Sequence, residues 1–194
     1  MSEHEISEDQ IHFLEKRTIT VEDFDAPGLI LDIGGGGEGI IGQLKGEKVV
    51  AIDLSKEELK EAPAGPAKIV MDARNLKFPD DMFSTVTAFF TLMYIQDKAD
   101  CELVFREAFR VLKSGGCFLI WDTVIPDRPD TDKEIVAFHI DVRLPDREIA
   151  TGYGTRWPDE DTRRLCTQLA ELVGFNVVSK EAQGASFFLE LKKQ

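Results

Sequence analysis

The sequence predicts an α/β fold in which helices cover both faces of a doubly wound, mostly parallel sheet of seven strands. Short apolar runs, typical of strands buried on both faces, alternate along the chain with amphipathic helical patterns. A cluster of glycines directly follows the first apolar run, as at the ligand-binding edge of open α/β sheets. Two closing strands without a helix between them predict an antiparallel edge strand.

Most element boundaries carry a turn or capping signal. The strands are expected at residues 29–33, 48–52, 68–71, 83–90, 117–121, 175–178 and 187–191, and the helices at 40–45, 56–62, 98–112 and 161–173. Ser55, followed three residues later by Glu58, predicts a capping box at the start of the second helix. Residues 113–116 are expected to end the third helix with a glycine cap, and Gly174 to end the last.

Length and composition restrict the classes of protein that the chain can represent. At 194 residues we expect a single domain, spanning 1–194. The net charge of −13 disfavours nucleic acid, which is bound mainly by Lys and Arg. No apolar run reaches the ~20 residues of a membrane span, and the N-terminus has no apolar core of a signal peptide, so we expect a cytoplasmic protein without membrane contact. The scattered Cys and His residues lack metal-ligand spacing, and no metal is expected.

The glycine cluster is compatible with two kinds of ligand-binding turn. Gly34, Gly36 and Gly39 satisfy the dinucleotide pattern G-x-G-x-x-G, and Asp53 follows at about the distance of a ribose-binding acid. With Asp32 placed two residues before Gly34, the same stretch also reads as D-x-G-x-G. Glycine permits the sharp turn and the close ligand approach that both interpretations need. The rest of the chain has to decide between them.

Five blocks, in order and near their usual spacing, resemble class I (Rossmann-like) S-adenosylmethionine (SAM)-dependent methyltransferases, closest to the type 11 group. The blocks are residues 31–36, 50–55, 71–73, 76–83 and 105–116, within a resemblance that covers about 26–121. Three positions depart from the family pattern: Ser84 replaces an acid, Ser114 a proline, and Glu38 the third glycine of the first motif. The resemblance implies a SAM-dependent transferase that releases S-adenosylhomocysteine (SAH).

The resemblance also implies a role for each residue along the strand ends. Gly34, Gly35 and Gly36 would let the backbone approach the cofactor, and Asp32 would hold its amino-acid end through water. Asp53 would accept hydrogen bonds from both ribose hydroxyls. The remaining expected contacts are Leu54 on the adenine face, Asp72 accepting from the adenine amino group, the Ala73 N–H donating to a ring nitrogen, and Phe89 and Phe90 along the methionine moiety.

The methyl acceptor cannot be identified from the sequence, but some classes are disfavoured. No Asn-Pro-Pro-Tyr-like tetrad of amino-nucleobase methylation follows the fourth strand, and no Pro-Cys nucleophile for cytosine appears there. With the acidic charge, these absences favour a small-molecule acceptor. Transfer from a sulfonium is an in-line displacement that depends mainly on alignment. A general base is needed only for an acceptor that is protonated at neutral pH.

Two segments outside the resemblance are expected to build the acceptor site. Residues 1–25 form an N-terminal cap, with a short amphipathic helix over 9–17 that would bring His12 or Arg17 near the methionine carboxylate. Residues 123–157 form an insertion or lid, in which residues 137–153 alternate as a hairpin around a turn at 145–146. This hairpin would line the cleft or form a homodimer. The acceptor-site candidates are Tyr94, Tyr153 and Trp157, with His139 as a candidate base.

Two other functions remain open at this point. An NAD(P)-binding oxidoreductase would be stabilised by NAD and not by SAH. A methyltransferase-like domain kept for a non-catalytic binding role would still bind SAM, so that only turnover would separate it from an enzyme.

Overall fold

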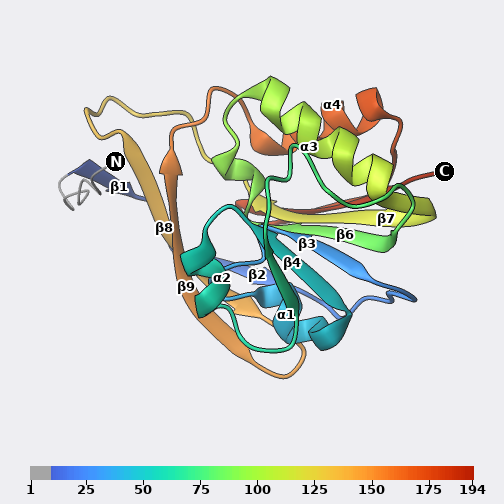
Figure 1. Cartoon of the computed structure of the whole chain (residues 1–194). Coiled ribbons are helices and arrows are strands. Elements are labelled where there is room, and N and C mark those ends of the chain that lie inside the picture. Colours follow the sequence, from blue (N-terminus) through green and yellow to red (C-terminus); the bar gives the residue numbers. More distant parts are fainter. Residues whose placement is uncertain (1–9) are drawn as a thin grey trace.

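A seven-stranded sheet forms the centre of the computed structural model, which describes residues 10–194 (Figure 1). Its strand order is β10-β11-β7-β6-β3-β4-β5. These strands are β3 (Ile30–Ile33), β4 (Val49–Asp53), β5 (Ala67–Val70), β6 (Phe83–Phe89), β7 (Leu112–Thr123), β10 (Asn176–Gln183) and β11 (Ser186–Lys192). Strands β5, β4, β3, β6 and β7 pair in parallel. The mostly parallel sheet is confirmed, and its antiparallel strand is β11, one position in from the edge strand β10.

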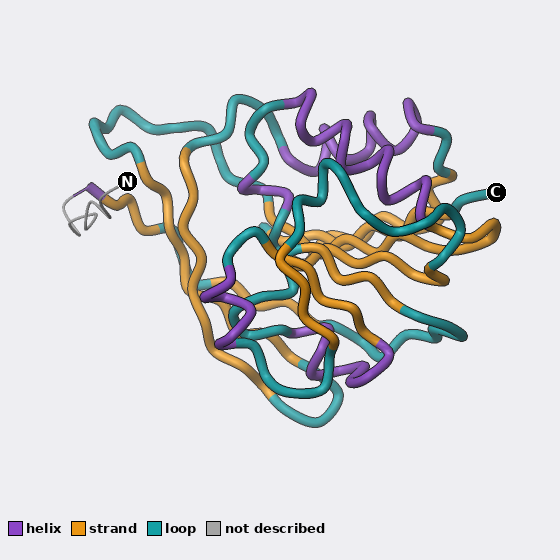
Figure 2. The backbone as a smooth tube through the Cα atoms, in the orientation of Figure 1, coloured by secondary structure: helices purple, strands orange, loops and turns teal. Residues whose placement is uncertain are grey.

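Helices and a second sheet cover the two faces of this sheet (Figures 1 and 2). One face packs against α3 (Lys98–Val111) and α4 (Thr162–Val173), through a core that includes Phe105, Phe118 and Leu169. The other face packs against α1 (Ile40–Lys45) and the second sheet, through a core that includes Trp121 and Phe138. Helix α2 (Lys56–Glu61) follows β4. None of the helices within residues 10–194 is both long and apolar enough to cross a membrane.

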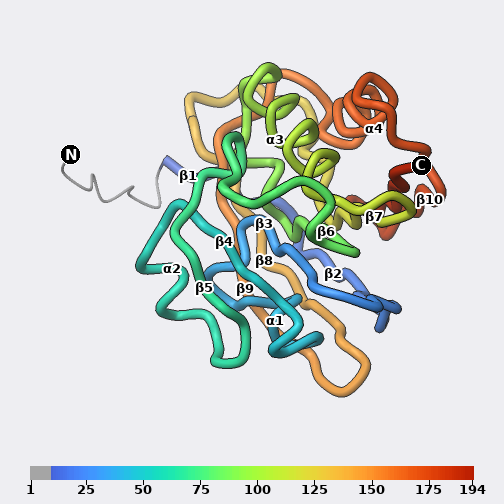
Figure 3. Tube along the Cα trace, turned by 45° about the vertical axis from the view of Figure 1, so that its right-hand side comes forward, coloured from blue at the N-terminus to red at the C-terminus, as the bar shows by residue number. Residues whose placement is uncertain are grey.

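The second sheet is built around the hairpin that the sequence predicts. Strand β8 (Ile135–Arg143) pairs antiparallel with β9 (Glu148–Arg156), and a turn in which the Leu144 N–H donates to the Arg147 carbonyl at 2.8 Å joins them. Strands β1 (Ile11–Phe13) and β2 (Arg17–Thr20) pair in parallel with successive parts of β8. Figure 3 shows β2, β8 and β9 lying across the main sheet from α3 and α4. The apolar face of the hairpin is therefore buried within its own chain.

Two of the expected elements are wrong. The amphipathic helix over 9–17 is absent from the described part of that range, where Ile11–Phe13 and the start of β2 are extended because they pair with β8; residue 9 lies outside the described residues. The third helix does not end in a glycine cap. Its cap is Leu112, with φ −72° and ψ 138°, because Leu112 already pairs with Phe83 as the first residue of β7.

A buried carboxylate at the end of β7 fixes the turn that follows β6. Asp122 is fully buried and accepts hydrogen bonds from the backbone N–H groups of Leu92 and Met93 at 3.0 and 3.2 Å. These residues begin the 3-10 turn Leu92–Tyr94, which carries Tyr94. Arg17 of β2 is a charged neighbour of Asp122, and its guanidinium lies 4.1 Å from the centroid of the Phe138 ring. Asp122 thus holds this turn and places a negative charge near Arg17 of the second sheet.

We predict that Ile19→Ala lowers the free energy of unfolding by about 2–4 kcal/mol, because Ile19 is fully buried between β8 and the main sheet. Thr18→Ala, at the half-buried neighbouring position of β2, is the matched control and should cost far less. Urea denaturation measures both changes. A loss below about 0.5 kcal/mol for Ile19→Ala would show that β2 does not belong to the core.

Candidate active site

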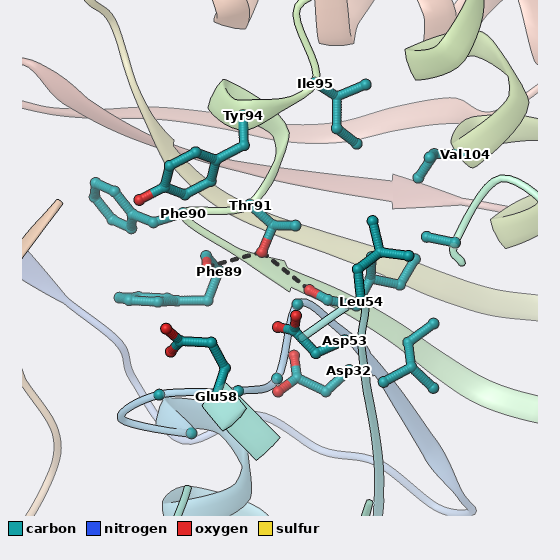
Figure 4. Close-up of a pocket in the computed structure, with 18 of the residues that line it drawn as sticks. Asp32, Asp53, Leu54, Glu58, Phe89, Phe90, Thr91, Tyr94, Ile95 and Val104 are labelled. Atoms are coloured by element: carbon teal, nitrogen blue, oxygen red, sulfur yellow. Dashed lines mark hydrogen bonds between the residues drawn. The ribbon is translucent and has the colours of Figure 1, made fainter. Parts of the chain in front are cut away.

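A large cavity lies where parallel strands of the main sheet end, beside the glycine-rich loop. Its volume is about 970 Å³, which is at the upper end of ~300–1,000 Å³ for small-molecule sites. The walls come from the loop after β3, the ends of β4 and β6, helix α2 and the hairpin strand β9 (Figure 4). Ligands bind at this edge in open α/β sheets. The cavity is therefore the candidate active site.

The first glycine of the loop is required because the loop backbone lies against the side chain of Thr91, just after β6. Gly34 has φ +73°, and a Cβ atom there would lie 2.3 Å from Thr91 Oγ1. The Thr91 hydroxyl donates at 3.0 Å to the carbonyl of Ile33 and lies 3.1 Å from that of Phe89 (Figure 4). Any side chain at position 34 would push the loop off this threonine. The loop and the end of β6 are thus held together.

The next two glycines bring the backbone against carboxylates. A Cβ atom on Gly35 would lie 2.7 Å from Asp32 Oδ2. On Gly36 it would lie 2.6 Å from the Cβ of Glu58 and 2.9 Å from Asp53 Oδ2. Only a bare backbone fits between these groups. Both positions line the cavity, so a ligand can reach the main chain there.

Asp32 is a buried acid beneath the loop. Asp32 is only 2% exposed, and its carboxylate accepts a hydrogen bond from the Thr87 hydroxyl at 2.7 Å. Burial raises the pKa of Asp32 to about 7; the Thr87 hydrogen bond opposes this rise, and the negative charge of Asp53 adds to it. A carboxyl group with this pKa changes charge near neutral pH. It would respond to a cation placed in the cavity.

Asp53 is the last residue of β4; one of its carboxylate oxygens accepts a hydrogen bond and the other faces the glycine loop. Its Oδ1 accepts from the backbone N–H of Ser55 at 2.8 Å, which orients the start of α2. The Ser55 hydroxyl caps that helix by accepting from Glu58 N–H at 3.1 Å, which confirms half of the predicted capping box. Leu54, next in the chain, is 67% exposed and lines the cavity. An acceptor oxygen and an apolar surface are therefore adjacent.

Asp72 and Ala73 line the cavity beyond Leu54, where Asp72 is engaged by a guanidinium. Arg74 donates to Asp72 Oδ2 from Nη2 at 2.7 Å and to Asp100 from Nη1 at 2.6 Å. The hydrogen bond from Arg74 lowers the pKa of Asp72. Asp72 therefore lines this end of the cavity, as expected. An adenine amino group bound there would have to share the Asp72 carboxylate with Arg74.

Phe89 and Phe90 form an aromatic wall at the opposite end. Their ring centroids are 4.9 Å apart, and Phe90 stacks on Tyr153 at 5.1 Å with an interplanar angle of 11°. Phe90 has φ +48°, a conformation that is rare for a bulky residue. Its N–H donates to Trp121 O at 2.7 Å, which holds the strained backbone in place. Such strain is typical of functional sites.

The four acceptor-site candidates separate into two pairs. Tyr94 and Tyr153 line the cavity. Trp157 does not; its Nε1 donates to Lys133 O at 2.9 Å, and its ring lies 5.4 Å from that of His12. His139 is exposed on the outer face of β8, where it stacks on Phe13 at 6.0 Å. Alternation along the strand turns His139 away from the cavity because its neighbour Phe138 points into the core.

The sequence analysis assigned no role in the site to several residues that line the cavity. Glu38 and Glu58 both line the cavity, and the Thr151 hydroxyl of β9 donates to Glu38 Oε1. The departure of Glu38 from the glycine pattern was a visible signal, because a charged residue within a glycine loop needs a partner. Arg17, expected near the ligand, lies instead beneath Phe138 and outside the described lining of the cavity.

Comparisons with known proteins agree with this geometry. Residues 31–120 match the family model described as a methyltransferase domain. The chain is 28% identical over 171 residues to the ubiquinone/menaquinone biosynthesis C-methyltransferase of Proteus mirabilis, covering 77% of this chain and 67% of that protein. It is 29% identical over 175 residues to phosphoethanolamine N-methyltransferase 1 of Zea mays, covering 85% of this chain and 31% of that protein.

A solved structure extends the likeness of fold beyond the matched domain. The PH0226 protein from Pyrococcus horikoshii aligns with a TM-score of 0.63 at 23% identity, over 86% of this chain and 82% of that one. The chain spans less than a third of the length of several curated relatives that it matches. In its family match over residues 31–120, the order of its motifs and its fold, the chain is similar to the class I S-adenosylmethionine-dependent methyltransferases.

Proposed function

We propose that this chain binds SAM in the cavity and transfers the methyl group by in-line displacement to a small-molecule acceptor. The observation that carries this proposal is the bare backbone of Gly36 beside Asp53 Oδ2, with the exposed Leu54 next to it. A ribose needs a carboxylate acceptor, an adenine needs an apolar surface, and the ammonium of an amino-acid end needs an acid such as Asp32, since the N–H groups of Gly34 and Gly35 already donate to Ile52 O. All three lie along one edge of the sheet, so the residues present fit the cofactor.

Each residue contributes binding or orientation. When bound, SAM supplies a methyl group on a sulfonium, whose thioether is a good leaving group. Asp53 would hold the ribose hydroxyls, Leu54 the adenine, and Gly34–Gly36 the methionine part. Phe89 and Phe90 would exclude water around the sulfonium, and Asp32 would balance the positive charge of the ammonium at the amino-acid end. Alignment of this kind supplies ~7–11 kcal/mol of the barrier in favourable cases.

Small-molecule acceptors are supported by the relatives and by the charge of the chain. The two relatives described above are named for phosphoethanolamine and for ubiquinone or menaquinone biosynthesis. The net charge of −13 disfavours nucleic acid. His139 has no part in this proposal because it faces away from the cavity. Tyr94 and Tyr153 remain as acceptor-site residues.

Other expectations stay as predictions of the sequence. These are a single domain over 1–194, a lid role for 123–157, a cytoplasmic location and a homodimer through 137–153. Since the apolar face of the hairpin is used within the chain, a dimer would have to use its outer face or the free edge of β9.

Thermal-shift measurements with SAM, SAH, NAD and NADP test the proposed function. We expect SAM and SAH to raise the melting temperature, because a ligand that binds only the folded state stabilises it. NAD and NADP should have no effect. Stabilisation by NAD or NADP alone would contradict the proposal and favour an oxidoreductase. Binding without turnover against any acceptor would favour a non-catalytic role.

We predict that Asp53→Asn weakens SAH binding by roughly 5- to 150-fold, since it replaces one carboxylate oxygen with an amide donor and forfeits about 1–3 kcal/mol. The amide oxygen can still accept from Ser55 N–H, so the start of α2 is preserved. Glu57→Gln, an exposed change on α2, is the matched control. Calorimetry measures the affinity, and unchanged binding in Asp53→Asn would remove Asp53 from the site.

We also predict that SAH binds more tightly as the pH rises from 6 to 8. The pKa of Asp32 is raised to about 7, so the free protein holds a proton there below neutrality. The ammonium group of SAH favours the ionised form, so binding releases that proton and is opposed at low pH. Asp32→Asn should flatten this dependence while keeping the Thr87 hydrogen bond. An equal pH dependence in the variant would exclude Asp32 as its source.

A further inference from the structure

The cavity continues past the residues assigned to the cofactor, toward the hairpin. Beyond Phe90, which borders both parts, its lining includes Tyr94, Gly152 and Tyr153. Phe90 and Tyr153 stack in parallel, and Phe138 closes the arrangement from behind, 6.0 Å from the Phe90 ring. In the view of Figure 4 the rings of Tyr94 and Phe90 lie above the carboxylates of Asp32, Asp53 and Glu58. This end of the cavity has the aromatic surfaces of a second binding site.

Carboxylates face these aromatic rings. Glu38 reaches the hairpin, where the Thr151 hydroxyl donates to its Oε1, and Tyr153 is its other neighbour there. Glu58 lies on the far side of the loop, with its Oε2 3.0 Å from the position of a Cβ atom on Gly37. A carboxylate accepts about four hydrogen bonds, so the one from Thr151 leaves Glu38 free to bind a donor.

The charge of the cavity disfavours an anionic acceptor. Among the described lining residues the only cation is Arg74, and it is paired with both Asp72 and Asp100. An anionic head group would meet Glu38 and Glu58 without a free partner. Like charges placed this close repel, and the repulsion is screened least inside a cavity.

A phenol or other acidic hydroxyl is also disfavoured. Such an acceptor reacts as its anion. The phenol of Tyr153 lies in the same surroundings, where burial, and after it the negative charge of Glu38, raises the pKa of the Tyr153 hydroxyl. An acceptor phenol in the same place would hold its proton for the same reasons. A cation has the opposite response, because carboxylates and aromatic faces both attract it.

We propose that the acceptor is a small amine, bound as its ammonium form by Glu38 against Phe90, Tyr94 and Tyr153, and methylated on nitrogen. This inference rests on the proposed function. The ammonium gives a proton to the carboxylate of Glu58, which lies close enough to Glu38 for their charges to interact. Its nitrogen lone pair then forms a bond to the methyl carbon as the carbon–sulfur bond breaks and sulfur keeps the electron pair. Glu58 suits the proton because burial, then Glu61, Asp53 and Glu38, raise its pKa.

The test compares three probes that share a phenyl group and differ in charge. Calorimetry with SAH-loaded protein would measure the binding of 2-phenylethylamine, 2-phenylethanol and 3-phenylpropanoate. We expect the amine to bind at least about tenfold more tightly than the alcohol, the carboxylate not to bind, and salt to weaken only the amine. Prior titration with SAH separates the two claims, since failure to bind SAH would contradict the proposed function itself.

A pair of variants then assigns the preference to Glu38. Glu38→Gln keeps an acceptor for Thr151 but removes the charge, and should abolish the preference for the amine while changing SAH affinity less than about threefold. Glu57→Gln removes the same charge from an exposed position of α2 and should leave the preference intact. The inference is overturned if SAH binds but the amine does not, if the alcohol or carboxylate binds as tightly, or if Glu38→Gln retains the preference.

Discussion

The whole arrangement depends on a loop whose glycines can carry no side chains where they cross the ends of β6 and β4. Gly34 lies against Thr91 at the end of β6, and Gly36 lies against Asp53 at the end of β4, in contacts that a Cβ atom would occupy. These contacts place the backbone of the glycine loop and the Asp53 carboxylate along the same cavity. The family resemblance in this stretch therefore has a steric basis that can be read directly from the structure.

The second sheet completes the cavity that the main sheet begins. Its hairpin buries Phe138 against Phe90, brings Tyr153 onto the same ring, and reaches the glycine loop through Thr151 and Glu38. The strained backbone of Phe90 is stabilised within this packing. The loop, the end of β6 and the hairpin thus form one contact network. A change in the hairpin would therefore alter the glycine loop without altering the central sheet.

Local patterns were sufficient to predict most of the fold. The apolar runs of β3, β4 and β6, the cap at Ser55 and the alternation in 137–153 each depend on neighbours in the chain, and the structure contains all of them. The order of the motifs added the cofactor loop and Asp53. The outward position of His139 was also implied, because alternation puts it opposite Phe138 once that residue enters the core.

Long-range pairing explains what the sequence did not reveal. Residues 9–17 were expected to be helical because apolar residues fall at a helical spacing, but Ile11–Phe13 and Arg17 pair with β8, more than 120 residues away. Leu112 leaves α3 early because it pairs with Phe83. Glu38 could be recognised as a departure from the glycine pattern, whereas its partner Thr151 could not, because nothing local joins residues 113 positions apart.

A crystal structure of the complex with SAH tests the central claim most directly. The account predicts SAH in the cavity, with the ribose hydroxyls at Asp53 Oδ2, the adenine on Leu54 and the amino-acid end on the backbone of Gly34–Gly36. It also predicts open space between the sulfur atom and the rings of Tyr94 and Tyr153, where an acceptor would sit. SAH bound elsewhere, or a ribose that does not contact Asp53, would contradict it.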